Sequence, residues 1–149
     1  MTSVKSQDLE DFELLDHVGH LLRRAQQIAV AAYSQEVGRD LRPRQFSLLL
    51  AIYQQPGLHQ VELTELIGMD RSTISEISER LEKRGLLERR PDEADERASK
   101  LYITSQGSAA VEAALPGILG VHQNLLARLP THLHVPFIAA LKTLAATED

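Results

Sequence analysis

The chain has 149 residues, of which 43% are hydrophobic and 25% charged, and this composition is that of one folded domain, alone or with a dimerisation extension. Aromatic residues make up 4% and Trp is absent, which favours a helix-rich core over a β-sandwich. The absence of Cys excludes disulfides, thiolate metal sites and cysteine nucleophiles, and the net charge of −5 argues against an unspecific coat on nucleic acid.

Residues 8–37 form one long segment in which apolar side chains recur every three or four residues, as at Leu15, Val18 and Leu22. This spacing predicts a single amphipathic helix that ends at Gly38. The apolar stripe is wide, so we expect the helix to have a partner beyond its own domain.

Three shorter helices follow, over 43–54, 61–67 and 71–84. Pro43 suits the first turn of the first of them, and Pro56-Gly57 ends it. Asp70 is placed to cap the third by accepting from the free N–H groups of its first turn.

Two β-like runs, 86–90 and 100–103, flank a charged loop and predict a hairpin. Helices over 105–128, with a kink at Pro116-Gly117, and over 132–146 complete the chain. The order predicts a mainly α protein: a winged helix-turn-helix with a two-stranded hairpin wing and a helical dimerisation domain.

The sequence carries no phosphate loop, no Gly-x-Gly-x-x-Gly, no His-Glu-x-x-His and no Gly-x-Ser-x-Gly, so we expect no enzyme. His17 and His20 lie three residues apart, but a third ligand is not evident and no metal site is predicted. No apolar run reaches about 18 residues, and residues 1–13 lack the pattern of a signal peptide, so we expect a cytoplasmic protein without membrane contact.

The start of the 71–84 helix carries short polar side chains, which let a helix approach base edges and phosphates in a major groove. An ordinary helix N-terminus has the same composition, so helix-turn-helix order is what favours DNA binding here. Basic residues on or beside the hairpin include Arg90, Arg97 and Lys100, and an Arg at a loop tip can enter the minor groove. Residues 39–100 nevertheless hold 11 basic and 12 acidic side chains.

Three stretches resemble the MarR family of transcriptional regulators: residues 41–46, residues 70–87, and the Asp95-Glu96-Arg97 run followed by Thr104 and Gly107. Arg42 and His59 stand where that family commonly has capping Ser or Thr residues.

The resemblance implies a homodimer in which residues 1–38 and 105–149 dimerise and residues 39–104 bind DNA. Two recognition helices would read successive major grooves of a double-stranded, pseudo-palindromic operator, with half-sites about 10 bp apart. By this resemblance Asp95 would hold Arg97 for the minor groove. The predicted DNA-contacting residues are Arg71, Ser72, Thr73, Ser75, Glu76, Arg90, Asp95, Arg97 and Lys100.

The family also implies a repressor without a cofactor that is released by a small-molecule effector, either an aromatic carboxylate or an aromatic acyl-CoA. The effector, the operator and the direction of the response stay open at this point. The candidate effector-binding residues are His17, His20, Arg23, Arg24, Tyr33, Phe46 and Tyr53. The near-neutral charge of 39–100 keeps one alternative open, a dimeric winged-helix interaction module that does not bind DNA.

Overall fold

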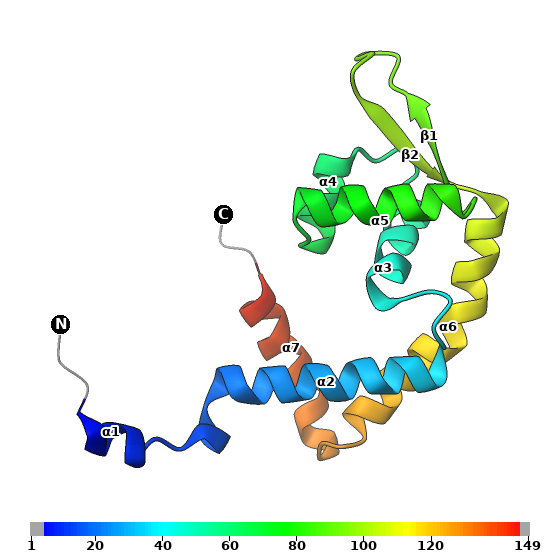
Figure 1. Ribbon diagram of the computed structural model, residues 1–149. Helices are drawn as coiled ribbons and strands as arrows, with labels where there is room; N and C mark the ends of the chain where they lie inside the picture. The colour runs from blue at the N-terminus through cyan, green and yellow to red at the C-terminus, as the bar shows by residue number, and fades with distance from the viewer. Residues whose placement is uncertain (1–4, 147–149) are drawn as a thin grey trace.

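The computed structural model describes residues 5–146, so the outermost residues of the predicted dimerisation region, 1–4 and 147–149, lie outside it. The fold is mainly helical, with one two-stranded sheet (Figure 1). The helices and strands are α1 (Ser6–Glu10), α2 (Val18–Glu36), α3 (Pro43–Gln54), α4 (Gln60–Ile67), α5 (Arg71–Lys83), β1 (Leu87–Pro91), β2 (Ser99–Ile103), α6 (Ser105–Leu126) and α7 (His134–Ala145).

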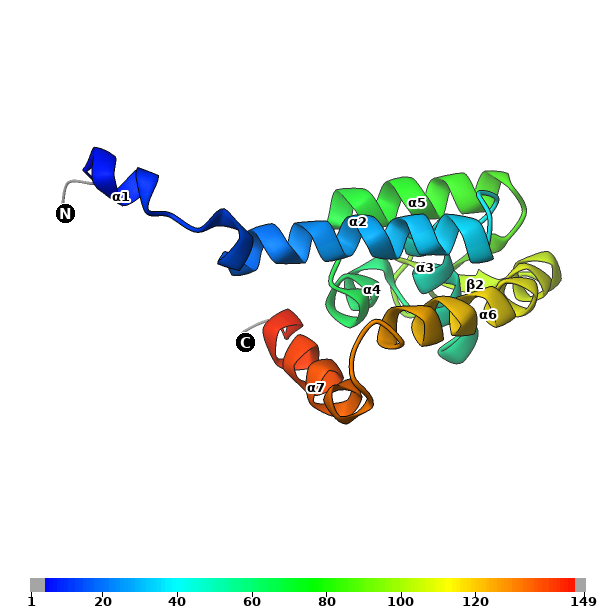
Figure 2. The same cartoon turned by 90° about the horizontal axis from the view of Figure 1, so that it is seen from below.

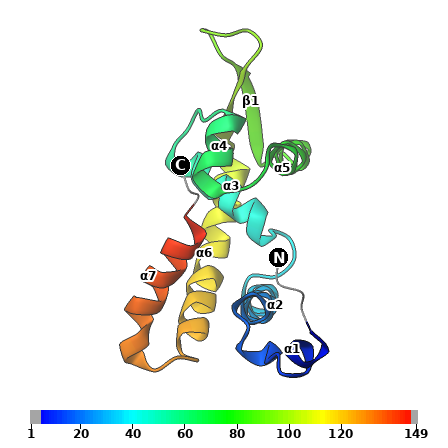
Figure 3. The same ribbon diagram turned by 90° about the vertical axis from the view of Figure 1, so that its left-hand side faces the viewer.

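The middle of the chain confirms the winged helix-turn-helix prediction. β1 and β2 pair antiparallel with Leu87 opposite Ile103, and Leu58 adds an isolated bridge to Leu101. α4 ends at Gly68, whose left-handed backbone makes the turn into α5. The hairpin therefore stands on the helix-turn-helix at one end of the molecule, and α2 and α7 lie at the other (Figures 1 and 3).

A single helix over 8–37 is wrong. The chain forms α1, a 3-10 turn at Leu14–Asp16 and then α2, and Figure 2 shows α1 projecting beyond the rest of the molecule. The reason is local, because His17 has an extended backbone and its Nδ1 accepts from the His20 N–H at 3.4 Å. His17 is therefore the N-cap residue of α2. Because an N-cap residue has a non-helical backbone, a helix that precedes it cannot continue into α2.

The core lies within the winged part and the first half of α6. The largest fully buried apolar side chains come from α3, α4, α5 and the hairpin, and Val111 and Ala114 of α6 join them. Most large apolar side chains that remain exposed belong instead to the N-terminal segment and to α6 and α7. None of the described helices combines the length and apolarity that crossing a membrane requires.

Two glycines allow α6 to lie close to its neighbours. A Cβ on Gly107 would stand 2.0 Å from the Leu86 carbonyl oxygen, and one on Gly117 would stand 2.6 Å from that of Glu36. α6 remains helical through Pro116. Gly107 thus joins α6 to the base of the wing, and Gly117 joins it to α2.

Candidate nucleic-acid interface

The first turn of α5 is built around the carboxylate of Asp70. Its Oδ1 accepts from the Thr73 N–H at 2.9 Å and from the Ser72 hydroxyl at 2.6 Å, while Oδ2 accepts from the Thr73 hydroxyl at 2.6 Å. These hydrogen bonds hold the pKa of Asp70 far below its usual range, so the cap is ionised. The two hydroxyls use their donors on Asp70, and their lone pairs stay available to accept from an outside donor.

The rest of α5 divides into a buried and an exposed face. Ile74, Ser78 and Leu81 are buried, while Arg71 and Ser75 are exposed. Glu76 pairs with Arg80 one turn later, so its charge is partly compensated. The exposed face therefore presents Arg71 and short polar side chains at the N-terminal end of α5, the end with which a recognition helix contacts base edges.

On strand β1 of the wing, two neighbouring arginines make different contacts. The Arg90 guanidinium carbon lies 4.2 Å from the centre of the Tyr102 ring, and its Nε donates to Glu88 at 3.0 Å. Arg89 instead faces inwards, where its Nε donates to Glu82 of α5 at 2.8 Å. The Arg90 guanidinium is thus paired with Glu88 and stacked on Tyr102 at an exposed position, and Arg89 ties β1 to α5.

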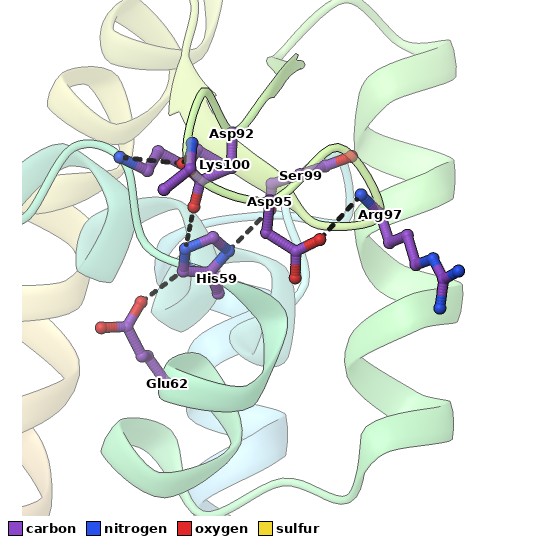
Figure 4. Close-up of polar contacts among 8 residues, drawn as sticks. His59, Glu62, Asp92, Asp95, Arg97, Ser99 and Lys100 are labelled. Atoms are coloured by element: carbon purple, nitrogen blue, oxygen red, sulfur yellow. Dashed lines mark hydrogen bonds and ion pairs between the residues drawn. The ribbon is translucent and has the colours of Figure 1, made fainter.

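The wing tip carries Arg97 in a turn that Asp95 organises. Asp95 Oδ1 accepts from the backbone N–H of Arg97 at 3.0 Å, and the guanidinium points away from it (Figure 4). Asp95 therefore contacts Arg97 through the backbone of the turn and not through the guanidinium, and its role in holding Arg97 for a groove stays a prediction. Both residues are exposed, which leaves the guanidinium accessible to a groove.

His59 is a residue of this region that the sequence prediction treated only as a missing cap. Its backbone N–H donates to Glu62 at 2.7 Å, which supplies one half of the cap, and its ring contacts the wing. Nε2 of that ring lies 3.0 Å from Oδ2 of Asp92, and Nζ of Lys100 lies 3.8 Å from Oδ1 of the same carboxylate. Lys100 is thus tied to Asp92 at the base of the loop, with its amino group partly exposed.

Two cavities lie beside α3. The first has a volume of about 430 Å³, the second about 340 Å³. The first is lined by Gln26, Val30, Arg42, Pro43, Arg44, Gln45, Thr73, Glu76, Ile77 and Arg80. The second is lined by Val30, Tyr33, Ser34, Gly38, Arg39, Arg42 and Pro43.

The structure does not bring the seven effector candidates together. Tyr33 lines the second cavity, but its hydroxyl donates to the Leu41 carbonyl at 2.6 Å, and burial raises its pKa. Phe46 is a core residue, and Tyr53 is exposed. The remaining four lie along α2 or cap it and line neither of these two cavities: His17, His20, Arg23 and Arg24.

Within the described residues, no group of three or more His, Asp or Glu side chains is arranged to hold a metal ion.

Comparison with known proteins agrees with this geometry. The model of the MarR family matches residues 41–99. The transcriptional regulator HosA of Escherichia coli O157:H7 is 31% identical over 128 residues, which is 86% of this chain and 94% of HosA.

Two solved structures share both fold and sequence with the chain. The PcaV transcriptional regulator of Streptomyces coelicolor, in complex with its natural ligand, is 34% identical with a TM-score of 0.86, over 90% of this chain and 95% of PcaV. BpsR of Bordetella bronchiseptica, whose DNA binding is regulated by 6-hydroxynicotinic acid, is 30% identical with a TM-score of 0.87, over 92% of this chain and 99% of BpsR. The chain belongs to the MarR family, and it is a transcriptional regulator of the winged helix-turn-helix type.

Proposed function

We propose that the protein is a homodimeric repressor that binds a pseudo-palindromic operator and is released by a small aromatic acid. The observation that carries the DNA-binding half is the exposed first turn of α5 together with the accessible guanidinium of Arg97 at the wing tip. On this proposal α5 enters a major groove through Arg71, Ser72, Thr73, Ser75 and Glu76. Arg97 enters the minor groove, and Arg90 and Lys100 contact phosphates between the two.

The dimer is proposed from the exposed apolar side chains outside the winged part. Val135 of α7 is 78% exposed and Leu15 is 62% exposed, and such residues are concentrated in 1–38 and 105–149. Large apolar side chains that are exposed in such numbers on a few elements are usually covered by a partner. We therefore assign dimerisation to these two segments and DNA binding to residues 39–104. A protein that binds operator DNA is expected to act in the cytoplasm.

The effector is proposed to bind in the first cavity rather than among the seven residues that the sequence suggested. Arg42 and Arg44 supply positive charge there, since Arg80 is paired with Glu76, and Val30 and Ile77 supply apolar wall. A guanidinium fork binds a carboxylate with two parallel hydrogen bonds, and the apolar wall suits a ring. The volume of about 430 Å³ favours a free aromatic acid over the larger coenzyme A thioester.

This cavity also explains how an effector could act on DNA binding. Its walls come from α2, α3 and α5, and Thr73 and Glu76 of the recognition helix are among the lining residues. A ligand that binds one placement of α5 more tightly than another shifts the population towards that placement. BpsR, whose DNA binding a hydroxynicotinic acid regulates, supports an aromatic acid as the class of effector.

The experiment is a titration of labelled operator DNA with wild type, Arg42→Ala and Arg24→Ala. Each titration is run with and without a panel of aromatic acids and their coenzyme A thioesters. Arg24 is exposed on α2 and lines neither cavity, so it is the matched control. We expect Arg42→Ala to raise the effector concentration needed for release about tenfold or more, as loss of a charged hydrogen bond implies. The opposite ranking of the two variants would place the effector on α2 instead.

A dimer that binds no DNA under any condition would favour the alternative function, a protein-interaction module. The near-neutral charge of residues 39–100 is the one observation on that side.

A further inference from the structure

His59 connects the N-terminus of α4 to the wing loop (Figure 4). Its Nε2 lies 3.0 Å from Oδ2 of Asp92, and its Nδ1 lies 3.2 Å from the carbonyl oxygen of Ser99. The contact is half-buried, since the side chain of His59 is 30% exposed and that of Asp92 is 12% exposed. We name these two ring contacts the wing anchor.

Both atoms that face the ring are hydrogen-bond acceptors. A carbonyl oxygen cannot donate, and Asp92 is held ionised because the Ala94 N–H, Lys100 and His59 all lower its pKa. A neutral imidazole has one N–H and can satisfy only one of the two oxygens, whereas an imidazolium donates to both. The wing anchor is therefore complete only when the ring of His59 is doubly protonated.

The charged groups around the ring are few. Asp92 faces it from the wing loop, and Lys100 of β2 lies 3.8 Å from the other oxygen of that carboxylate. On its own helix, Glu62 accepts from the backbone N–H of His59 rather than from the ring. The ring itself therefore faces one carboxylate, that of Asp92, and one carbonyl oxygen, that of Ser99.

Asp92 also shapes the loop that presents Arg97. Its Oδ1 accepts from the Ala94 N–H at 3.0 Å, and its backbone N–H donates to the Ala98 carbonyl at 3.1 Å. A ring that holds Asp92 is therefore linked, through that residue, to both ends of the loop that carries Arg97. A loop that is already in its bound conformation loses less entropy when it enters a groove.

We propose that His59 is a positioning residue for the wing, and that protonation of its ring strengthens operator binding by holding the Arg97 loop against α4. The proposal rests on the DNA-binding function proposed above. It predicts that operator affinity falls as the pH is raised from 6 to 8, the range in which histidine side chains change charge.

Three substitutions separate this mechanism from a general effect of charge. His59→Gln removes the imidazolium. Asp92→Asn keeps an oxygen for the Ala94 N–H and supplies an NH₂ group that donates to ring Nε2, so a neutral ring tautomer now satisfies both contacts. Glu93→Gln removes the same charge from the neighbouring, exposed position and is the matched control.

The first measurement is operator affinity by fluorescence anisotropy at pH 6 and pH 8 for the four proteins. We expect wild type and Glu93→Gln to lose about fivefold more affinity across this range than His59→Gln, the factor that corresponds to a half-exposed ion pair. Asp92→Asn should lack this additional pH dependence while keeping wild-type effector release. An equal pH dependence in wild type and His59→Gln would overturn the proposal.

The second measurement needs no DNA. Amide hydrogen exchange of free wild type and His59→Gln at the same pH should show faster exchange in residues 92–98 of the variant and unchanged exchange in α3 and α5. Equal exchange in the loop would overturn the proposal even if operator binding is established. Faster exchange in a protein that binds no operator would retain the anchor and refute the proposed function.

Discussion

Two glycine-to-alanine substitutions in α6 should have opposite effects on stability. Gly107 is the third residue of the helix, and a Cβ there would lie 2.0 Å from the Leu86 carbonyl oxygen and 2.7 Å from Ile103. Gly120 lies further along the same helix, where a Cβ would meet only the carboxylate of Glu36, at 3.2 Å. The first neighbour is backbone in the core and cannot move freely, whereas the second is the end of a flexible side chain.

The magnitude at Gly107 follows from what must move. Thr104 caps α6 by accepting from the Gly107 N–H at 3.0 Å, and its hydroxyl donates to the Gly85 carbonyl at 2.6 Å. Relieving the overlap displaces this cap, so an overpacking cost of about 1–3 kcal/mol adds to a cap loss of about 1 kcal/mol. We expect Gly107→Ala to lower the free energy of unfolding by roughly 3 kcal/mol, a large part of the usual 5–15 kcal/mol.

Gly120→Ala should raise the free energy of unfolding by up to about 1 kcal/mol, because Ala is the better helix former. The assay is urea unfolding followed by far-ultraviolet circular dichroism, with all proteins at one concentration because a dimer's stability depends on it. Equal midpoints for Gly107→Ala and wild type would refute the close approach of α6 to the base of the wing. A strongly destabilised Gly120→Ala would refute the distinction between the two sites.

Three further outcomes are expected. The buried hydroxyl of Ser78 has no partner in the described part of the chain, so Ser78→Ala should raise the free energy of unfolding by about 1 kcal/mol in the same urea assay. The hydrogen bonds from Ser72 and Thr73 lower the pKa of Asp70 in the folded state, so its contribution to stability is complete above the ordinary Asp range and lost as the pH falls below it. The stability difference between wild type and Asp70→Ala should therefore shrink in acid titrations, and a constant difference would contradict it. Arg97→Ala should weaken operator binding and reduce the slope of affinity against salt by about one, while leaving thermal stability unchanged.

Local chemistry made the winged part predictable. Pro43 marks the start of α3, Gly68 the turn and Asp70 the cap of α5, and each acts through its immediate neighbours. Such signals are present in the sequence because their partners lie within a few residues. The helix bounds of α3 and the hairpin were accordingly predicted closely.

The first helix failed for a related reason. The spacing of apolar side chains continues across 8–37, but most of these side chains are exposed and do not pack into the core, so their periodicity did not require one continuous helix. The capping contact of His17 with the His20 N–H interrupts it, and histidine is not among the usual capping residues. Where apolar side chains do not pack into the core, local contacts thus decide where a helix begins.

The contacts of His59 and the first cavity were not predicted, because both are formed by residues that are distant in the sequence. The ring of His59 meets Asp92 and Ser99 only after the hairpin folds back on α4. The first cavity joins Arg42 of the α3 entry to Arg80 of α5, and no motif connects them. The seven effector candidates were chosen along single helices, whereas a cavity is made between helices.

The most direct test of the account is a fluorescence-anisotropy titration of the full-length protein with DNA from upstream of its own coding region, at two salt concentrations. The account predicts tight binding that weakens steeply with salt, because phosphate contacts release counterions, and it predicts that one aromatic acid abolishes the binding of wild type. It also predicts that Arg97→Ala lowers the salt slope. Absence of binding to this DNA and to a genome-derived library, by a protein that is a stable dimer, would contradict it.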